Sequence, residues 1–157
     1  MRIQPLDPLP ADLLKPLVDE GAREGFRFPR RLVEEHAAGE VRFDGAGEVL
    51  LGVFDGDELV AVGGVTRDPY DDADDVGRVR HVYVRAAHRR RGIGAMLMRA
   101  LEAHARRHFS TLTLRTDTEA AARFYAALGF DALTPGGTAT HRRELGPPGK
   151  HHLPGER

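Results

Sequence analysis

Apolar positions along the chain change their spacing several times, and each change marks the boundary of a predicted element. Short apolar runs predict strands at residues 2–6, 48–54, 58–66, 76–84, 111–116 and 138–145. Helical spacing predicts helices at residues 11–20, 30–38, 92–107 and 120–128. In the helix at 92–107, the stripe expected to face the core is Ile93, Met96, Leu97, Ala100, Leu101 and His104. This order of strands and helices is typical of the α/β and α+β classes.

Two local patterns predict how the strands pair. Asp55-Gly56-Asp57 separates two apolar runs, and Asp-Gly in this position is typical of a tight β-hairpin. The strand at 76–84, the helix at 92–107 and the strand at 111–116 make a βαβ unit. We therefore expect the two strands of that unit to be parallel neighbours.

The valines of the strand at 76–84 do not keep one alternation. Val79 has one side-chain parity, whereas Val82 and Val84 have the other. A β-bulge shifts the parity in this way, and a strand buried on both faces gives the same pattern. The sequence leaves both interpretations open.

Length and composition predict one globular domain. The chain has 157 residues, of which 41% are hydrophobic and 30% charged. We expect residues 1–145 to form the domain and the Pro/Gly-rich residues 146–157 to form a flexible tail. The net charge of −1 argues against nucleic acid as a partner. A cytoplasmic protein with no membrane partner is expected, because no long apolar run, signal peptide or cysteine is present.

The sequence lacks the residues that several kinds of catalytic site require. Ser110 is the only serine and is in no Gly-x-Ser-x-Gly context, which argues against an acyl-enzyme on serine. His104 and His108 are four residues apart, but no third metal ligand is near them in the sequence. Cations also favour the last turn of a helix, and we prefer that interpretation. No metal is expected.

A basic, glycine-rich segment, HRRRGIG, lies where the strand at 76–84 leads into the helix at 92–107. Glycines let the backbone approach a ligand closely, and free N–H groups at a helix N-terminus favour an anion. Arginine adds charge-assisted hydrogen bonds to phosphate. The segment therefore indicates a pyrophosphate cradle, with an arginine-rich surface turn as the alternative. Neither a dinucleotide fingerprint nor a Walker A loop fits, since Leu97 replaces the third glycine and this segment contains no lysine.

This segment and a second block together resemble the GNAT acyltransferases, which bind acetyl-CoA. Arg89, Gly92 and Gly94 match the family signature R/Q-x-x-G-x-G/A, and the strand before them matches as HVYV. The second block, LRTDTEAAARFYAALGF, covers residues 114–130. The resemblance extends over the chain except its tail. It implies a mixed, mostly antiparallel sheet of about six or seven strands, with a central parallel pair splayed to admit CoA and helices on both faces.

The resemblance also implies how acetyl-CoA is held. Backbone groups of Val82 and Val84 would pair with the pantetheine arm, N–H groups of residues 90–95 would hold the pyrophosphate, and Arg89 with its neighbours would add charge. Position 118 departs from the family pattern, because threonine replaces the frequent asparagine. Thr118 could bond the CoA arm or cap the following helix. The expected cofactor-binding residues are Val82, Tyr83, Val84, Arg89, Arg90, Arg91, Gly92, Ile93, Gly94, Ala95 and Thr118.

Two residues are expected to move protons. Tyr125 matches the family tyrosine that protonates the leaving thiolate, and a phenol with a pKa of about 10 can do this at neutral pH. A packing role is the alternative for Tyr125. His81 is the candidate base, because an amine acceptor must lose a proton. Arg78 and Arg80 on the same strand would instead suit an anionic substrate, so the charge of the acceptor stays open.

The sequence therefore predicts an N-acetyltransferase that transfers an acetyl group from acetyl-CoA, by direct attack, to an amine of a small molecule or peptide. The alternative is a non-catalytic CoA-binding or regulatory module with the same fold. The intact Arg89, Gly92, Gly94 and Tyr125 favour the enzyme. A homodimer is compatible with the sequence.

Overall fold

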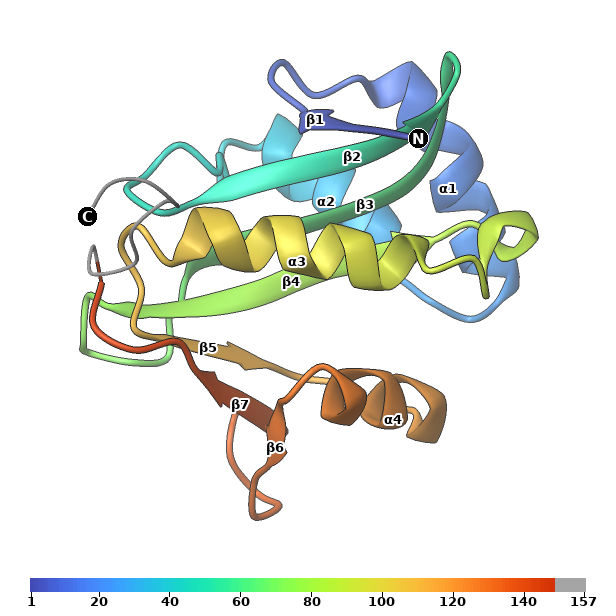
Figure 1. Cartoon of the computed structure of the whole chain (residues 1–157). Coiled ribbons are helices and arrows are strands. Elements are labelled where there is room, and N and C mark those ends of the chain that lie inside the picture. Colours follow the sequence, from blue (N-terminus) through green and yellow to red (C-terminus); the bar gives the residue numbers. More distant parts are fainter. Residues whose placement is uncertain (149–157) are drawn as a thin grey trace, which may run out of the picture.

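The computed structural model describes residues 1–148, which form one seven-stranded sheet with helices on both faces (Figure 1). The strands are β1 (Arg2–Pro5), β2 (Val49–Asp55), β3 (Glu58–Arg67), β4 (Val76–Val84), β5 (Thr111–Leu114), β6 (Asp131–Ala132) and β7 (His141–Glu144). The helices are α1 (Ala11–Arg23), α2 (Phe28–Ala37), α3 (Ile93–Ala105) and α4 (Glu119–Ala127), with a 3₁₀ turn at Ala86–His88. The strand order is β1-β2-β3-β4-β5-β7-β6, and only β4 and β5 are parallel.

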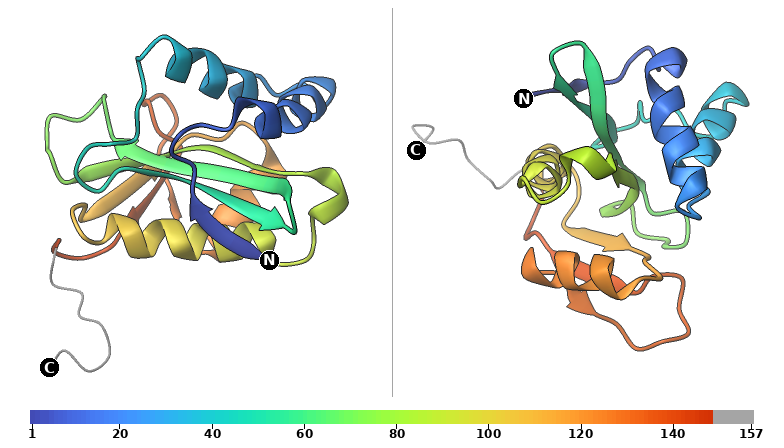
Figure 2. Two further views of the ribbon diagram at one scale, coloured as in Figure 1. Left: turned by 90° about the horizontal axis from the view of Figure 1, so that it is seen from above. Right: turned by 90° about the vertical axis from the view of Figure 1, so that its right-hand side faces the viewer.

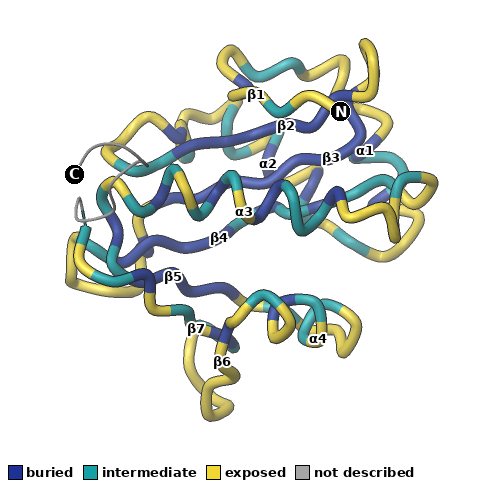
Figure 3. The backbone as a smooth tube through the Cα atoms, viewed as in Figure 1, coloured by how far each residue is buried: buried dark blue, intermediate teal, exposed yellow. Residues whose placement is uncertain are grey.

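Two apolar clusters hold the helices to the two faces of the sheet. On one face, α1 and α2 place Leu14, Leu17 and Leu32 against β2, β3 and β4. On the other face, α3 and α4 share a larger cluster with the same strands and with β5. The left view of Figure 2 shows the sheet between the α1–α2 pair and α3, and Figure 3 shows that the central strands are buried along most of their length. Each central strand therefore contributes to two cores.

The predicted pairing of strands is confirmed. β2 and β3 form the hairpin, and Gly56 in its turn has a φ of +61°, which suits glycine. β4 and β5 are parallel, with residues 76–78 opposite residues 111–113, and α3 is the helix that connects them. The mixed fold class and the helices on both faces also agree with expectation.

Several details differ from expectation, and one is that β5 ends at Leu114 rather than at residue 116. α2 begins at Phe28 rather than residue 30, because Pro29 fits well in the first turn of a helix. The last strand is shorter than predicted, and the two residues of β6 pair with its beginning. α3 buries Met98 and Ala105, whereas Met96 and His104 are only partly buried. The buried face of the helix is therefore rotated by about one residue relative to the predicted face.

Two further observations bear on the helices and on the predicted tail. None of the helices within residues 1–148 is both long enough and apolar enough to cross a membrane. Most of the tail predicted at 146–157 lies outside the described residues, which end at residue 148.

A left-handed glycine ends α4, the helix that carries Tyr125. Gly129 has a φ of +97°, and the N–H groups of Gly129 and Phe130 donate to the carbonyl oxygens of Ala126 and Tyr125. This pattern is a Schellman motif, in which Phe130 is buried. α1 ends with the same pattern at Gly25, whose φ is +88°.

We expect Gly129→Ala to lower the free energy of unfolding more than Gly25→Ala does. Both changes place a Cβ on a left-handed residue, which costs about 1–2 kcal/mol. A Cβ at Gly129 would also collide with Nη1 of Arg143, whereas a Cβ at Gly25 would meet nothing within 4 Å. Urea unfolding of the two variants measures the difference. Equal losses would show that Arg143 moves aside at no cost.

Candidate active site

β4 pairs with β5 only at its beginning. Residues 76–78 of β4 lie opposite residues 111–113, and β4 then continues to Val84, whereas β5 ends at Leu114. Figure 1 shows the two strands diverging towards α4. Within the described part of the chain, residues 79–84 therefore have no strand partner on the edge that faces away from β3. Such an edge can hydrogen-bond an extended ligand as if it were another strand.

A β-bulge distorts β4 at the same place. His81 and Val82 together oppose one residue of β3, and His81 has a φ of +60°. A positive φ is uncommon for a residue other than glycine. β4 is also buried on both faces, with Tyr83 in the cluster beneath α1 and Val79 in the cluster beneath α3. Both interpretations of the valine parity are therefore correct.

The glycine-rich segment leads into an uncapped helix N-terminus. Gly92 is the N-cap of α3 with a φ of +76°, and no side chain caps the helix or places a negative charge in its first turn. The first helical hydrogen bond runs from the Met96 N–H to the Gly92 carbonyl over 3.0 Å. The amides of residues 93–95 precede this bond and can therefore donate to an anion. A Cβ at Gly92 would meet nothing within 4 Å, so the turn borders open space.

The three arginines of this segment have different surroundings. Arg89 donates from Nη1 and Nη2 to the two carboxylate oxygens of Glu24 over 2.8 and 2.6 Å, and from Nε to the Val84 carbonyl over 2.9 Å. The hydrogen bond with Glu24 raises the pKa of Arg89. Arg90 and Arg91 are exposed and have no side-chain partner among residues 1–148. In this conformation they are the arginines free to meet an anion at the N-terminus of α3.

Tyr125 lies on the α3 face of the sheet, in the same apolar cluster as Ile93. Its neighbour Phe124 contacts the first turn of α3, where a Cβ at Gly94 would lie 3.1 Å from the Phe124 ring. Tyr125 is only 8% exposed, so it does pack in the core. Burial raises the pKa of Tyr125 above that of a free phenol. The group therefore keeps its proton at neutral pH and can donate it.

Thr118 is the N-cap of α4. Its Oγ1 accepts a hydrogen bond from the Ala121 N–H over 3.2 Å, which confirms the capping interpretation. The hydroxyl hydrogen is not used in this bond. A second contact from Thr118 to a ligand is therefore compatible with its role as a cap.

His81 and two charged side chains form a partly buried group on the opposite face of the sheet, beneath α2. Nε2 of His81 lies 3.7 Å from Oε1 of Glu35, and Nη2 of Arg80 lies 3.4 Å from the same oxygen. Burial, assisted by Arg80, lowers the pKa of His81 to about 4, so the ring is neutral at pH 7. Both ring nitrogens are buried and make no hydrogen bond of ordinary geometry to the described residues.

Glu35 was not among the residues predicted from the sequence. It is 45 positions from Arg80, and nothing in a single sequence marks a contact between α2 and β4. Its side chain is 18% exposed, against 4% for His81. Solvent therefore reaches Glu35 more readily than it reaches His81.

The two arginines considered for an anionic substrate both have internal partners. Arg80 meets Glu35, as described above. Arg78 donates from Nη2 to the Thr138 carbonyl over 2.8 Å, and its Nη1 lies 4.0 Å from the buried carboxylate of Asp68. An anionic substrate would therefore have to displace Glu35 from Arg80, whereas Nη1 of Arg78 is buried and makes no hydrogen bond to a described residue.

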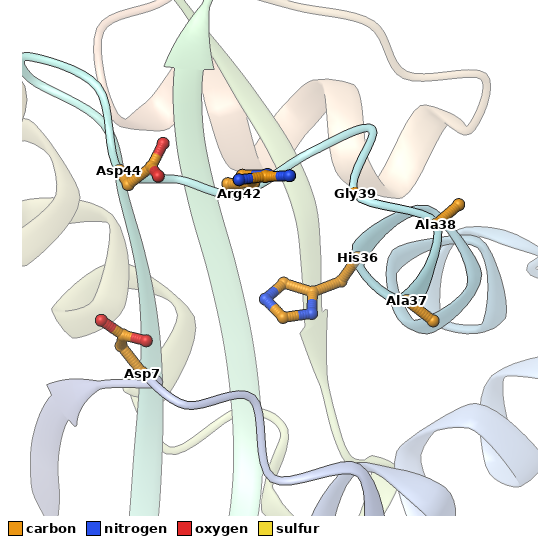
Figure 4. A pocket seen from close by; sticks show the side chains of 7 residues that line it. All are labelled: Asp7, His36, Ala37, Ala38, Gly39, Arg42 and Asp44. Carbon is orange, nitrogen blue, oxygen red and sulfur yellow. The ribbon is translucent and has the colours of Figure 1, made fainter.

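One cavity lies outside this site. It has a volume of about 510 Å³ and is lined by the end of α2, the loop after it and Asp7 (Figure 4). His36 projects into it between Arg42 and Asp7, and none of the residues predicted for acetyl-CoA or proton transfer lines it. Among residues 1–148, no three His, Asp or Glu side chains are arranged to hold a metal ion.

Comparisons with known proteins agree with this geometry. The sequence model of the acetyltransferase (GNAT) family matches residues 16–130. The comparison with curated proteins finds no match. Among solved structures, the chain is similar to a protein from Exiguobacterium sp. 255-15 that is described as an acetyltransferase. The two share 26% identity and a TM-score of 0.81, over 91% of this chain and 92% of that one.

Two structures of lower identity share the fold. The ribosomal-protein-S18-alanine N-acetyltransferase from Escherichia coli is 17% identical, with a TM-score of 0.66 over 97% of this chain and 98% of that one. An aminoglycoside 6'-N-acetyltransferase complexed with coenzyme A is 18% identical, with a TM-score of 0.70 over 94% of this chain and 98% of that one. The family match spans well over half of the chain, from α1 through the glycine-rich segment to the end of α4. This chain therefore belongs to the GNAT family of acetyltransferases.

Proposed function

We propose that the protein is an acetyl-CoA-dependent N-acetyltransferase that acts on an amine of a small molecule or peptide. One juxtaposition supports this more than any other observation. The unpaired edge of β4, the uncapped N-terminus of α3 and helix α4, which carries Tyr125, all border the place where β4 and β5 diverge (Figure 1). These are the parts needed to hold an extended ligand by its backbone contacts, bind its phosphates and donate a proton at its reacting end.

The residues at this place fit acetyl-CoA. The backbone groups of Val82 and the N–H of Val84 would pair with the pantetheine arm, since the Val84 carbonyl already accepts a hydrogen bond from Arg89, and the amides of residues 90–95 would hold the pyrophosphate. Arg90 and Arg91 would supply positive charge, since neither has a side-chain partner among the described residues. When bound, acetyl-CoA supplies an acetyl group activated as a thioester.

The proposed chemistry requires two proton transfers. Tyr125 would donate its phenolic proton to the sulfur that leaves, since burial keeps the phenol protonated at neutral pH. The attacking amine must lose a proton, and neutral His81 would accept it. Because both ring nitrogens of His81 are buried, the more exposed Glu35 would carry the proton between His81 and solvent.

A turnover assay separates this function from a non-catalytic CoA-binding module. The full chain is incubated with acetyl-CoA and a panel of amines that includes polyamines, amino acids and short peptides, and free thiol is measured. The enzyme should release thiol faster with at least one amine. CoA binding by calorimetry without amine-dependent thiol release would favour the binding module.

Gly92→Val should weaken CoA binding by about tenfold or more, because a side chain at this turn blocks the approach of phosphate to the helix amides. Gly56→Val is the matched control. Both glycines have a positive φ and open space around a Cβ, but Gly56 lies in the β2–β3 hairpin. Calorimetry with CoA and thermal unfolding are measured on both. Similar losses of stability with unchanged CoA affinity in Gly92→Val would exclude this turn as the phosphate site.

Tyr125→Phe should lower kcat by about 10²–10⁴-fold and leave the affinity for CoA unchanged, because general acid catalysis is typically worth this factor. Phenylalanine fills the same space in the core, so the midpoint of thermal unfolding should change little. Tyr70→Phe, which removes an exposed phenol outside the site, is the control. Wild-type turnover in Tyr125→Phe would remove this residue from the proposed chemistry.

His81 should make folding stability depend on pH in a defined window. The unfolded ring, with a pKa of about 6.5, binds a proton that the folded ring, with a pKa of about 4, does not bind. The free energy of unfolding therefore falls as the pH decreases from 6.5 to 4. Asparagine tolerates the positive φ at this position. In His81→Asn, the slope of the free energy of unfolding against pH in this window should therefore decrease by up to the contribution of one bound proton. Urea unfolding at several pH values tests it, and an unchanged pH dependence would mean that His81 titrates normally.

A further inference from the structure

Arg89 is the signature arginine of the glycine-rich segment, yet its side chain is turned towards α1. Each of its three nitrogen atoms donates a hydrogen bond, two to Glu24 and one to the Val84 carbonyl. The guanidinium also lies 5.4 Å from the centre of the Tyr83 ring. A guanidinium held by both carboxylate oxygens has a fixed orientation, which a single ammonium contact would not give.

Glu24 belongs to a wider cluster that joins the end of α1 to β4 and to the turn after it. We call this group, Glu20, Glu24, Tyr83, Arg85 and Arg89, the α1 cluster. The Tyr83 hydroxyl lies 2.5 Å from Glu24 and 2.9 Å from Glu20. Oε1 of Glu20 also accepts the N–H of Ala86 over 2.7 Å. Side chains from α1 therefore hold β4 and the segment that follows it at several points.

The electrostatics of the α1 cluster agree with a fixed arrangement. The hydrogen bond from Arg89 lowers the pKa of Glu24. Burial opposes ionisation of Glu20, but hydrogen bonds from the Ala86 N–H and from Tyr83 outweigh it and lower its pKa. Both carboxylates are therefore ionised at neutral pH and attract the arginines of the segment.

From these contacts, and on the basis of the proposed function, we infer that Arg89 is a positioning residue. Its bidentate contact with Glu24 fixes the glycine-rich turn before the ligand arrives. The charges that meet the phosphates of CoA come from Arg90 and Arg91. The amides of residues 93–95 then keep their direction without help from the ligand, so less conformational entropy is lost on binding. The same contact connects the glycine-rich turn to α1. Tyr83 packs on Phe26, which lies between α1 and α2, and on Phe28, the first residue of α2.

The change in CoA affinity caused by Glu24→Gln distinguishes this role from direct phosphate binding, because the two roles predict different directions of change. If Glu24 holds Arg89 in place for the turn, Glu24→Gln weakens CoA binding about tenfold, as does Arg89→Gln, and the double variant is no weaker than either single one. If Arg89 binds phosphate, loss of Glu24 frees the guanidinium, and CoA affinity rises or stays the same. The second result would overturn the inference.

Arg89→Lys provides an independent measurement. It keeps the positive charge but cannot reach both Glu24 oxygens and the Val84 carbonyl, so a positioning role predicts the same loss of CoA affinity as in Arg89→Gln. A phosphate-binding role predicts that Arg89→Lys retains most of the affinity, which would contradict the inference.

Arg91→Gln is the matched control, since it removes the same charge from an exposed arginine without a side-chain partner in the described chain. Calorimetry with CoA at several salt concentrations is combined with hydrogen exchange of the amides of residues 90–95 in the free protein. Arg91→Gln should reduce the salt dependence of binding and leave exchange unchanged, whereas Arg89→Gln should speed exchange and leave the salt dependence unchanged. The reverse pattern would overturn the inference.

If wild-type protein did not bind CoA at all, the proposed function would fail, although the exchange data would still test the contact with Glu24.

Discussion

The early end of the pairing between β4 and β5 is the constraint on which the candidate site depends. β5 has four residues and β4 has nine, so most of β4 has no neighbour on that edge among the described residues. Backbone groups that are buried without a hydrogen-bond partner cost free energy, so this edge requires water or a ligand. The chain cannot close the gap, because after β5 it turns away into α4, and Phe124 of that helix packs against the start of α3. The gap is thus bordered by the two helices that carry the amides proposed to bind phosphate and the phenol.

Burial sets the two proposed proton-transfer groups to opposite states at the same pH. It disfavours the charged form of any group, which raises the pKa of Tyr125 and lowers that of His81. At pH 7 the phenol is therefore protonated and the imidazole is not. These are the protonation states that acyl transfer to an amine needs, although burial also makes the phenol a weaker acid and the imidazole a weaker base. The two groups belong to opposite faces of the sheet, and β4 lies between them.

Local patterns in the sequence predicted the parts of the fold that depend on neighbours in the chain. The Asp-Gly hairpin, the βαβ unit and the uncapped glycine at the start of α3 are all of this kind. The valine parity of β4 indicated an irregularity, but only the register with β3 shows that it is a bulge. Contacts between distant segments had no such signal, since Arg89 and Glu24 are 65 positions apart. A charged side chain in one sequence does not reveal whether it faces a ligand or another residue, and for this reason Arg89 was expected at the phosphate.

The charges beneath α2 bear on which acceptor the site can admit. Arg80 and Arg78 are the cations of β4 on this face, and each lies close to a carboxylate, that of Glu35 or that of Asp68. An anionic acceptor at Arg80 would have to compete with Glu35, and the displaced carboxylate would be left partly buried without its counter-charge. A cationic or neutral amine meets no such competition. Arg80 and His81 both approach Oε1 of Glu35, and no described residue donates a hydrogen bond to its other oxygen, Oε2. The balance of charges on this face therefore favours an amine that approaches Glu35 over an acceptor whose nearest charge is negative.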